Sequence, residues 1–312
     1  MFKKTYLVVG LVLVLFVLVA GGCGTAAVAP TPEPQIVEVQ QTVVVQQTVV
    51  AEQTVVVEKE VVVTPTPEPA RPTGELRVGM TAGVNTLDPF MGPELNIINV
   101  AHHVNEALLF LADDGTVQPG LAESWENLDD TTWRIKLRQG VTFTNGEPFN
   151  ADAVIFSWKY SQQPDMLQKW GFGSVKDMVA EDAYTIKVTT AAPDPLFLMR
   201  LADMGWIVPP KYIEENGQEY FAEHPVGTGP FKLLEWKKGD RVSLEANEDY
   251  WLPGVPKVAK LTFIAIPEPA SRVAALKAGQ IDFAYRVESQ FVPDLLFDQD
   301  IKVLRFTVPR IY

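Results

Sequence analysis

The sequence has little cysteine and little histidine: Cys23 is the only cysteine, and there are three histidines in 312 residues. A lone cysteine cannot form an intramolecular disulfide, so the fold must depend on its hydrophobic core. His102 and His103 are adjacent and would point in different directions from a helix, and His224 is isolated. Metal sites need several ligands that converge. We therefore predict no metal site and no cofactor.

Catalytic motifs are missing as well. The sequence has no Gly-x-Ser-x-Gly elbow and no cysteine and histidine pair suited to nucleophilic catalysis. The segment GTGPFK at 227–232 superficially resembles a phosphate loop, but Pro230 has no amide hydrogen and strand-like residues follow it. Paired carboxylates at 113–114 and 129–130 lie between expected elements and are typical of turns. We predict that the protein is not an enzyme.

Basic residues are outnumbered, with 26 lysines and arginines against 39 aspartates and glutamates and a formal net charge of −13. Nucleic acids and anionic membrane surfaces attract basic proteins. The acidic balance therefore argues against both as partners. Seven tryptophans and sixteen phenylalanines supply enough apolar area for an ordered core.

The amino terminus carries an export signal. Lys3 and Lys4 precede an apolar run at 6–20, and small residues lead to Cys23. The run is shorter than the roughly twenty residues that a membrane-spanning helix needs. Because a lone cysteine follows small residues, the segment resembles a lipobox. We predict a signal peptide at 1–22 and lipidation of Cys23; an uncleaved membrane anchor and an ordinary secreted protein are the alternatives.

Residues 23–72 differ in composition from the rest of the chain. Four six-residue units, QQTVVV, QQTVVA, EQTVVV and EKEVVV, occupy 40–63 between proline-rich flanks. Proline fixes φ and removes a backbone donor, so the flanks should be extended spacers. We interpret this segment as a disordered tether; a self-associating β-segment is the alternative, since valine-rich runs of low charge can pair edge to edge.

Beyond residue 72 the pattern predicts a mixture of helices and strands. Apolar residues at helical spacing predict an amphipathic helix over 96–111. Alternation of apolar and polar residues predicts a half-buried strand at 132–138. Asn145-Gly146 marks a turn, and Asn150 is well placed to cap a helix. Further strands are expected at 184–188, 242–246 and 261–266, and a short helix from Pro269 to Gly279.

Several blocks carry a resemblance to a known family. They are GELRVGMTAGVNTLDPF at 74–90, the block at 114–158 that begins DGTVQPGLAESW, and the block at 224–285 that begins HPVGTGPFKLLEW. Together these blocks resemble family 5 of the extracytoplasmic solute-binding proteins, the peptide and nickel receptors of ABC importers. The blocks occur in the family's order, and the likeness covers most of 74–312.

The resemblance implies an α/β, periplasmic-binding-protein-like fold (type II, cluster C-like). It implies one lobe built from 73–115 and 202–312, with an inserted β-rich subdomain at 116–201. It also implies a second lobe that this sequence lacks, with the chain stopping near the hinge, so that only the amino-terminal lobe is present.

The resemblance further implies a function and a site. The expected protein is the substrate-binding subunit of an ABC importer, which captures a peptide-like or other small solute outside the cytoplasmic membrane and delivers it to permease and ATPase subunits. A surface adhesion or scaffold lipoprotein and an exported hydrolase are the alternatives. The ligand-binding residues that the resemblance implies are a cleft aromatic, Tyr285, the segment after TLDPF with Pro93, Glu94, Leu95 and Asn96, and Trp170 in the inserted subdomain.

Overall fold

The computed structural model describes residues 71–92, 94–112 and 114–304, which belong to the second of two units, 68–312. Pro93, Cys23 and residues 1–70 of the predicted signal peptide and tether lie outside the described residues. No helix in the described part of the chain is long and apolar enough to cross a membrane.

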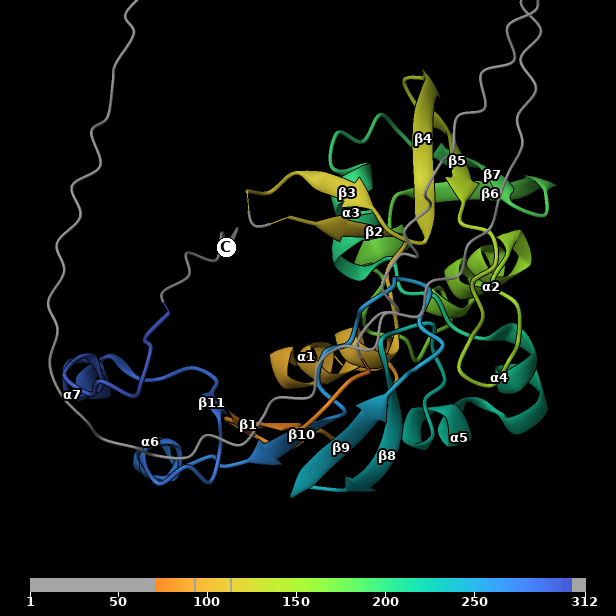
Figure 1. Ribbon diagram of the computed structural model, residues 1–312. Coiled ribbons are helices and arrows are strands. Elements are labelled where there is room, and N and C mark those ends of the chain that lie inside the picture. The colour runs from red at the N-terminus through yellow and green to blue at the C-terminus, as the bar shows by residue number, and fades with distance from the viewer. Residues whose placement is uncertain (1–70, 93, 113, 305–312) are drawn as a thin grey trace, which may run out of the picture. The chain divides into compact units, whose positions relative to one another are not determined.

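A five-stranded mixed sheet joins segments that are far apart in the sequence (Figure 1). The strand order is β11-β1-β10-β9-β8. Strand β1 is parallel to both of its neighbours, β11 and β10, whereas β9 is antiparallel to β10 and β8. Its strands are β1 (Glu75–Met80), β8 (Phe231–Lys237), β9 (Arg241–Ala246), β10 (Lys260–Ala265) and β11 (Phe283–Ala284).

A second sheet of four antiparallel strands has the order β4-β5-β7-β6. Along β5, Ile135 and Leu137 are buried while Lys136 is exposed, so the predicted strand at 132–138 is confirmed together with its alternation. The strands are β4 (Ala122–Asp129), β5 (Thr132–Leu137), β6 (Val175–Asp182) and β7 (Thr185–Thr190), and a separate hairpin is formed by β2 (Leu109–Leu111) and β3 (Val117–Pro119).

The helices are short, and local residue types account for some of their ends. The side chain of Asn150 accepts a hydrogen bond from Ala153 N at 3.1 Å, so the predicted cap of α2 is confirmed. Gly279 has a φ of 65° just beyond α6, a common way to end a helix. The helices are α1 (Leu95–Val104), α2 (Ala151–Ser161), α3 (Phe197–Met204), α4 (Pro210–Asn216), α5 (Gln218–Glu223), α6 (Pro269–Lys277) and α7 (Val292–Leu296), with 3-10 turns at Trp170–Phe172 and Ser289–Phe291.

The predicted helix over 96–111 is wrong at its carboxyl-terminal end. Helix α1 stops at Val104, and Asn105 has an extended backbone. Beyond it, Leu108 N donates to Gly205 O and Leu108 O accepts from Ala122 N, so this residue is paired on both sides by distant backbone. Apolar periodicity cannot distinguish such a buried extended segment from another helical turn.

The segment GTGPFK at 227–232 is a turn that leads into β8, as the sequence predicts. Gly229 N donates to Val104 O at 2.9 Å. A Cβ on Gly229 would lie 2.6 Å from that oxygen, and one on Gly227 would lie 2.0 Å from it. The glycines are therefore needed for the close approach of this turn to the end of α1 rather than for a phosphate.

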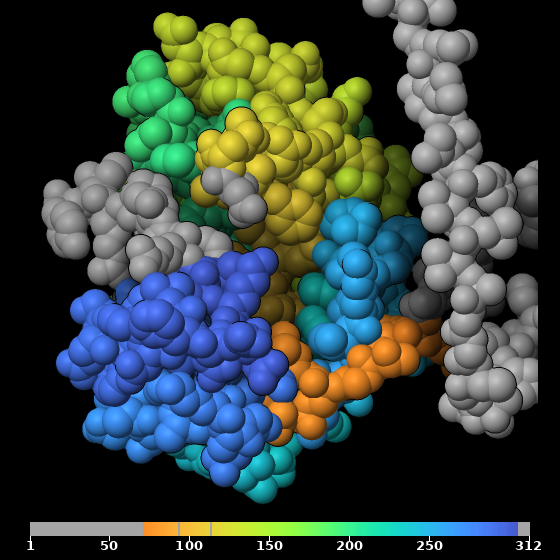
Figure 2. All heavy atoms as spheres, turned by 60° about the vertical axis from the view of Figure 1, so that its left-hand side comes forward, coloured from red at the N-terminus to blue at the C-terminus, as the bar shows by residue number. Residues whose placement is uncertain are grey.

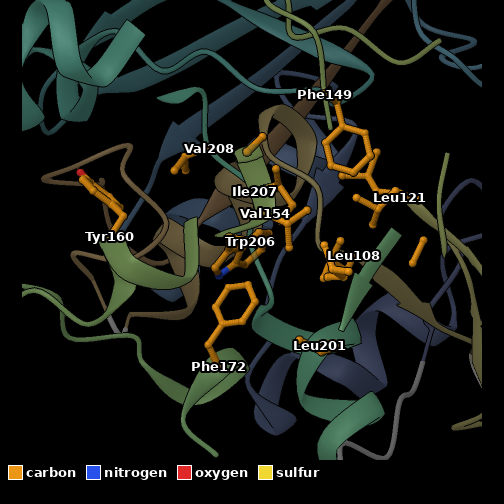
Figure 3. Close-up of a cluster of buried hydrophobic side chains, with 14 of the residues drawn as sticks. Leu108, Leu121, Phe149, Val154, Tyr160, Phe172, Leu201, Trp206, Ile207 and Val208 are labelled. Carbon is orange, nitrogen blue, oxygen red and sulfur yellow. The ribbon is translucent and has the colours of Figure 1, made fainter. Parts of the chain in front are cut away.

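Two clusters of buried apolar side chains fill the described part of the molecule. The larger cluster combines the inner face of the four-stranded sheet with α2, α3 and the segment around Trp206 (Figure 3). The smaller cluster joins α1 to the five-stranded sheet through residues such as Ile97, Val100 and Phe263. The strands β4 to β7 all fall within the predicted insertion at 116–201; its exact bounds stay a prediction.

Candidate functional site

Three adjacent parallel strands end at the same edge of the five-stranded sheet. Gly79 O, near the end of β1, accepts from Tyr285 N, and Met80 O accepts from Ile266 N, both at 2.9 Å. Figure 2 shows β1 in orange beside the later part of the chain in blue. In α/β sheets, ligands bind outside the carboxyl ends of the strands. We call this the carboxyl edge and define it by Thr81, Ile266 and Tyr285.

Tyr285 lies directly at the carboxyl edge. It follows β11 and is half-buried. Its backbone is fixed by the bond from its amide to Gly79 O. The Arg286 guanidinium carbon lies 5.7 Å from the centroid of the Tyr285 ring, so an aromatic and a cation are neighbours at the edge.

The predicted segment after TLDPF reaches the same edge through Asn96, which lies in the first turn of α1. The Asn96 side-chain amide lies 3.3 Å from the hydroxyl of Thr81, the residue that follows β1. Glu94 is exposed and its carbonyl accepts from Ile97 N at the start of the helix. Leu95 is half-buried and packs partly against the larger core. Of the described residues in this predicted segment, Asn96 has the most direct link to the edge.

Trp170 lies in a 3-10 turn and is linked to the same segment from the other side. Its side chain is 43% exposed, and the Arg200 guanidinium carbon lies 4.0 Å from its ring centroid. Two residues earlier, Gln168 donates from its backbone to Phe90 O at 2.9 Å and from its side chain to Gly92 O at 3.4 Å. The structure therefore places the segment after TLDPF between the carboxyl edge and the turn that holds Trp170.

A buried arginine, Arg272 of α6, holds the carboxyl edge together. It is 1% exposed and donates to Ile266 O at 2.7 Å and to Arg286 O at 2.8 Å. Its guanidinium also lies 3.1 Å from the Glu288 carboxylate. Sequence reasoning missed Arg272. The available signal was its spacing: it lies three positions before Ala275, on the face of α6 that is buried, where a charged side chain is rare unless it has partners.

Thr81, Gln168 and Arg286 are further neighbours that sequence reasoning missed. Thr81 and Gln168 become relevant only through hydrogen bonds to Asn96 and Gly92, which no local pattern predicts. The unusual backbone of Arg286, with a φ of 56°, likewise has no signature in its residue type.

Two buried carboxylates lie away from this edge and have a structural role. Asp88 is fully buried and accepts from Tyr160 Oη at 2.6 Å and Phe90 N at 2.8 Å; burial raises its pKa to about 6. Glu106 accepts from Tyr250 Oη at 2.6 Å and from the indole of Trp251 at 3.0 Å. Burial raises the pKa of Glu106 as well. Both carboxylates are satisfied by donors from distant segments, as buried polar groups require.

No predicted site residue lines a hollow of about 330 Å³ on the described surface. This hollow lies at the amino end of β11 and includes Gly279, Asp282 and Asp300 among its walls. Across residues 71–92, 94–112 and 114–304, no three histidine, cysteine, aspartate or glutamate side chains converge as metal ligands. Of the predicted residues, Tyr285 and Asn96 lie at the carboxyl edge, whereas Trp170 lies in the separate 3-10 turn.

Comparison with known proteins gives an independent account of the chain. Residues 116–312 match the family model for bacterial extracellular solute-binding proteins, family 5 (middle). The glutathione-binding protein GsiB of Escherichia coli O1:K1 / APEC is 31% identical over 217 residues, which are 68% of this chain and 42% of GsiB. The chain thus spans about half the length of the curated relatives it matches.

Solved structures of similar fold agree. The oligopeptide-binding protein AppA of Bacillus subtilis, in complex with a nonapeptide, aligns with a TM-score of 0.66 and 25% identity, covering 72% of this chain and 46% of AppA. The nickel ABC transporter structure from Bacillus halodurans aligns with a TM-score of 0.63 and 31% identity over the same shares of the two chains. The predicted α/β, type II periplasmic-binding-protein fold is confirmed.

Proposed function

The chain belongs to family 5 of the bacterial extracellular solute-binding proteins, and from this premise we propose that it supplies one wall of the solute site in the substrate-binding subunit of an ABC importer. The observation that carries the proposal is the gathering of Tyr285 and Asn96 at the carboxyl edge of β11, β1 and β10. Receptors of this class close two lobes around a ligand by a hinge. A single lobe of such a receptor therefore presents its side of the ligand site as an exposed surface.

The proposed solute is peptide-like. GsiB is a glutathione-binding protein and AppA was solved with a nonapeptide, so both relatives take ligands with peptide bonds and free carboxylates. A nickel chelate is the second candidate, because the Bacillus halodurans nickel transporter protein is as similar in sequence as GsiB. Apolar walls would supply contact area, and a few polar groups would supply orientation.

The residues proposed to contact the solute are those that the sequence singles out. Tyr285 offers a half-buried ring at the edge, and Asn96 offers an amide beside Thr81. Trp170 offers an exposed indole whose ring is stacked on Arg200. Pro93, Glu94 and Leu95 complete the proposed set as the rest of the segment that connects these groups.

Calorimetry on the full-length protein tests the solute class. Glutathione, trialanine and nickel(II)-histidine are titrated separately into protein that has been unfolded and refolded to remove carried-over ligand. The proposal expects micromolar or tighter binding of at least one of the two peptides. Binding of nickel-histidine alone would favour the second candidate. Failure of all three, together with no small molecule in mass spectra of the freshly purified protein, would contradict the binding function.

The proposed location is the outer face of the cytoplasmic membrane, with a lipid on Cys23 and residues 23–72 as a tether. The sequence of the export signal supports this proposal. Two or more acyl chains give stable membrane attachment. Cys23→Ser should therefore release the protein from the membrane fraction. Equal pelleting of variant and parent, with no acyl chain found by mass spectrometry, would rule out the anchor.

The proposed domain arrangement follows the sequence prediction. Residues 73–115 and 202–312 would form one lobe around the insertion at 116–201. The five-stranded sheet supports this arrangement, because β1 comes before the insertion while its partners β10 and β11 come after it. Limited proteolysis that cuts first in the exposed segments near residue 116 and at residues 191–195 would support an insertion with about these bounds, whereas early cuts within β5 or β7 would contradict it.

A further inference from the structure

We propose that Arg286 binds a carboxylate of the solute at the carboxyl edge, beside the ring of Tyr285. This inference rests on the proposed function, since it assigns a ligand group to the same site. It names a residue and a chemical class that neither the family match nor the sequence prediction supplies.

The backbone of Arg286 is the first argument. Its φ of 56° lies in the left-handed region, and within the described part of the chain no other residue except glycine has a positive φ. Side chains other than glycine, asparagine and aspartate are uncommon there because of steric conflict. Such outliers persist where the surrounding structure holds them, and they cluster at ligand sites.

The surrounding structure does hold this residue. The buried guanidinium of Arg272 donates to Arg286 O at 2.8 Å and to Ile266 O at 2.7 Å. One residue before, Tyr285 N donates to Gly79 O. Tyr285 is thus tied to β1, and the carbonyl of Arg286 itself is tied through Arg272 of α6 to the residue that follows β10. These hydrogen bonds fix the backbone from which the Arg286 side chain extends.

The side chain of Arg286 is the second argument. It is exposed, and within the described residues it makes no ion pair, whereas Arg77, Arg134 and Arg241 each have a carboxylate within 3.0 Å. The nearest acid along the chain, Glu288, lies against Arg272 instead. Among the described residues, Arg286 therefore leaves a guanidinium without a carboxylate partner at the candidate site, in a chain whose net charge is −13.

The chemistry of the pair defines the ligand. A planar guanidinium binds a carboxylate through two parallel hydrogen bonds, which is the geometry that arginine favours over lysine. The Tyr285 ring next to it supplies apolar area for the part of the solute that bears the carboxylate. The terminal carboxylate of a peptide-like solute fits both groups, whereas a cationic end does not.

The test compares a carboxylate with its amide. Calorimetry on the full-length protein uses trialanine or glutathione, whichever the parent binds more tightly, and the same peptide with its carboxyl-terminal carboxylate converted to a carboxamide. The parent should bind the carboxylate form at least about tenfold more tightly, which corresponds to about 1.4 kcal/mol. Arg286→Gln should remove this preference by weakening binding of the carboxylate form only. Arg286→Lys should restore part of it.

Two further variants separate binding from folding. Arg286→Gly relieves the left-handed backbone, so it should unfold at an equal or higher temperature and still lose the preference. Arg71→Gln makes the same change of charge at an exposed position before the amino end of β1, and it should leave both affinities unchanged.

The outcomes are distinct. Unchanged carboxylate affinity in Arg286→Gln or Arg286→Gly would overturn this inference and leave the proposed function standing. An equal loss for carboxylate and amide would overturn it too, because it would show a positional effect. If the parent binds neither peptide, the peptide-binding function fails and this inference fails with it.

Discussion

The two sheets of the described unit differ in the longest loop that a pair of strands must close. In the four-stranded sheet, β4 pairs with β5 and β6 pairs with β7 across short turns. In the five-stranded sheet, β1 pairs with β10, so that Glu75 faces Lys260. Local pairing closes short loops at small entropic cost, whereas the pairing of β1 must close a loop of well over a hundred residues. The candidate site lies on the sheet that contains this longest-range pairing, between β1 and β10.

The comparison separates stability from binding. The larger apolar core belongs to the region of the four-stranded sheet, and the residues proposed for binding lie at an exposed edge of the five-stranded sheet. Binding groups must be accessible, and accessible groups contribute little to the apolar core. Substitutions in the two regions should therefore divide into those that change the free energy of unfolding and those that change affinity.

The largest effect is expected in the larger core. Phe197 of α3 is fully buried, with its ring centroid 5.7 Å from that of Trp133 on β5. Phe197→Ala should lower the free energy of unfolding by about 3–5 kcal/mol, because it removes apolar burial and leaves a cavity. Urea denaturation measures this loss. Leu234→Ala, at a half-exposed position on β8, is the control and should lower the free energy of unfolding far less. Equal losses in the two variants would contradict the expected difference between the two regions.

A smaller loss is expected at the buried link between the end of α1 and the segment after β9. Glu106→Ala removes the acceptor for Tyr250 Oη and for the Trp251 indole, and unsatisfied buried donors should cost about 2–4 kcal/mol in total. Glu106→Gln keeps an acceptor oxygen and should cost less. Chemical denaturation of both variants at pH 7 checks this. A glutamine variant as unstable as the alanine variant would show that the negative charge is what matters.

Asp88 should make stability depend on pH. Its pKa is about 6 in the folded protein and near 3.8 in an unfolded chain, so the folded state binds the proton more tightly. The free energy of unfolding should therefore fall as pH rises from about 4 to about 6, by up to about 3 kcal/mol, and the contribution should be constant above pH 6.

The matched variant is Asp88→Asn, which has no titrating proton and can still bond Tyr160 and Phe90 N. The difference in unfolding free energy between parent and variant, measured from pH 4 to pH 7, isolates this one group. A difference that does not change with pH would show that Asp88 does not titrate in this range.

The smallest effect on stability, with the clearest effect on binding, is expected at the carboxyl edge. Tyr285→Ala should change the free energy of unfolding by less than about 1 kcal/mol, because the ring is only half-buried, while weakening peptide binding about tenfold. Thermal unfolding without ligand and calorimetry with ligand give the two values. Tyr220→Ala, on the exposed side of α5, should leave affinity unchanged. A large stability loss with unchanged affinity would assign Tyr285 to the core.

Sequence reasoning succeeded where the residues within one helix or strand are enough to specify it. The alternation along β5, the Asn150 cap and the helix from Pro269 are properties of a few neighbouring residues, and all three are confirmed. It was wrong at the end of α1, where Leu108 is paired with Gly205 and Ala122 from distant segments. The apolar pattern there is the same for a buried helix and for buried extended chain.

The sequence by itself determined the family, the mixed α/β class and the regions in which site residues should be sought, because motif order and local periodicity are written along the chain. Only the tertiary structure decided how those regions meet. The common edge of β11, β1 and β10 joins strands that are far apart along the chain, and it brings together the shorter-range link from Asn96 to Thr81 and the clamp of Arg272 on Arg286. Contacts of this kind form only after the long loops between them close, and no local pattern encodes which partners result.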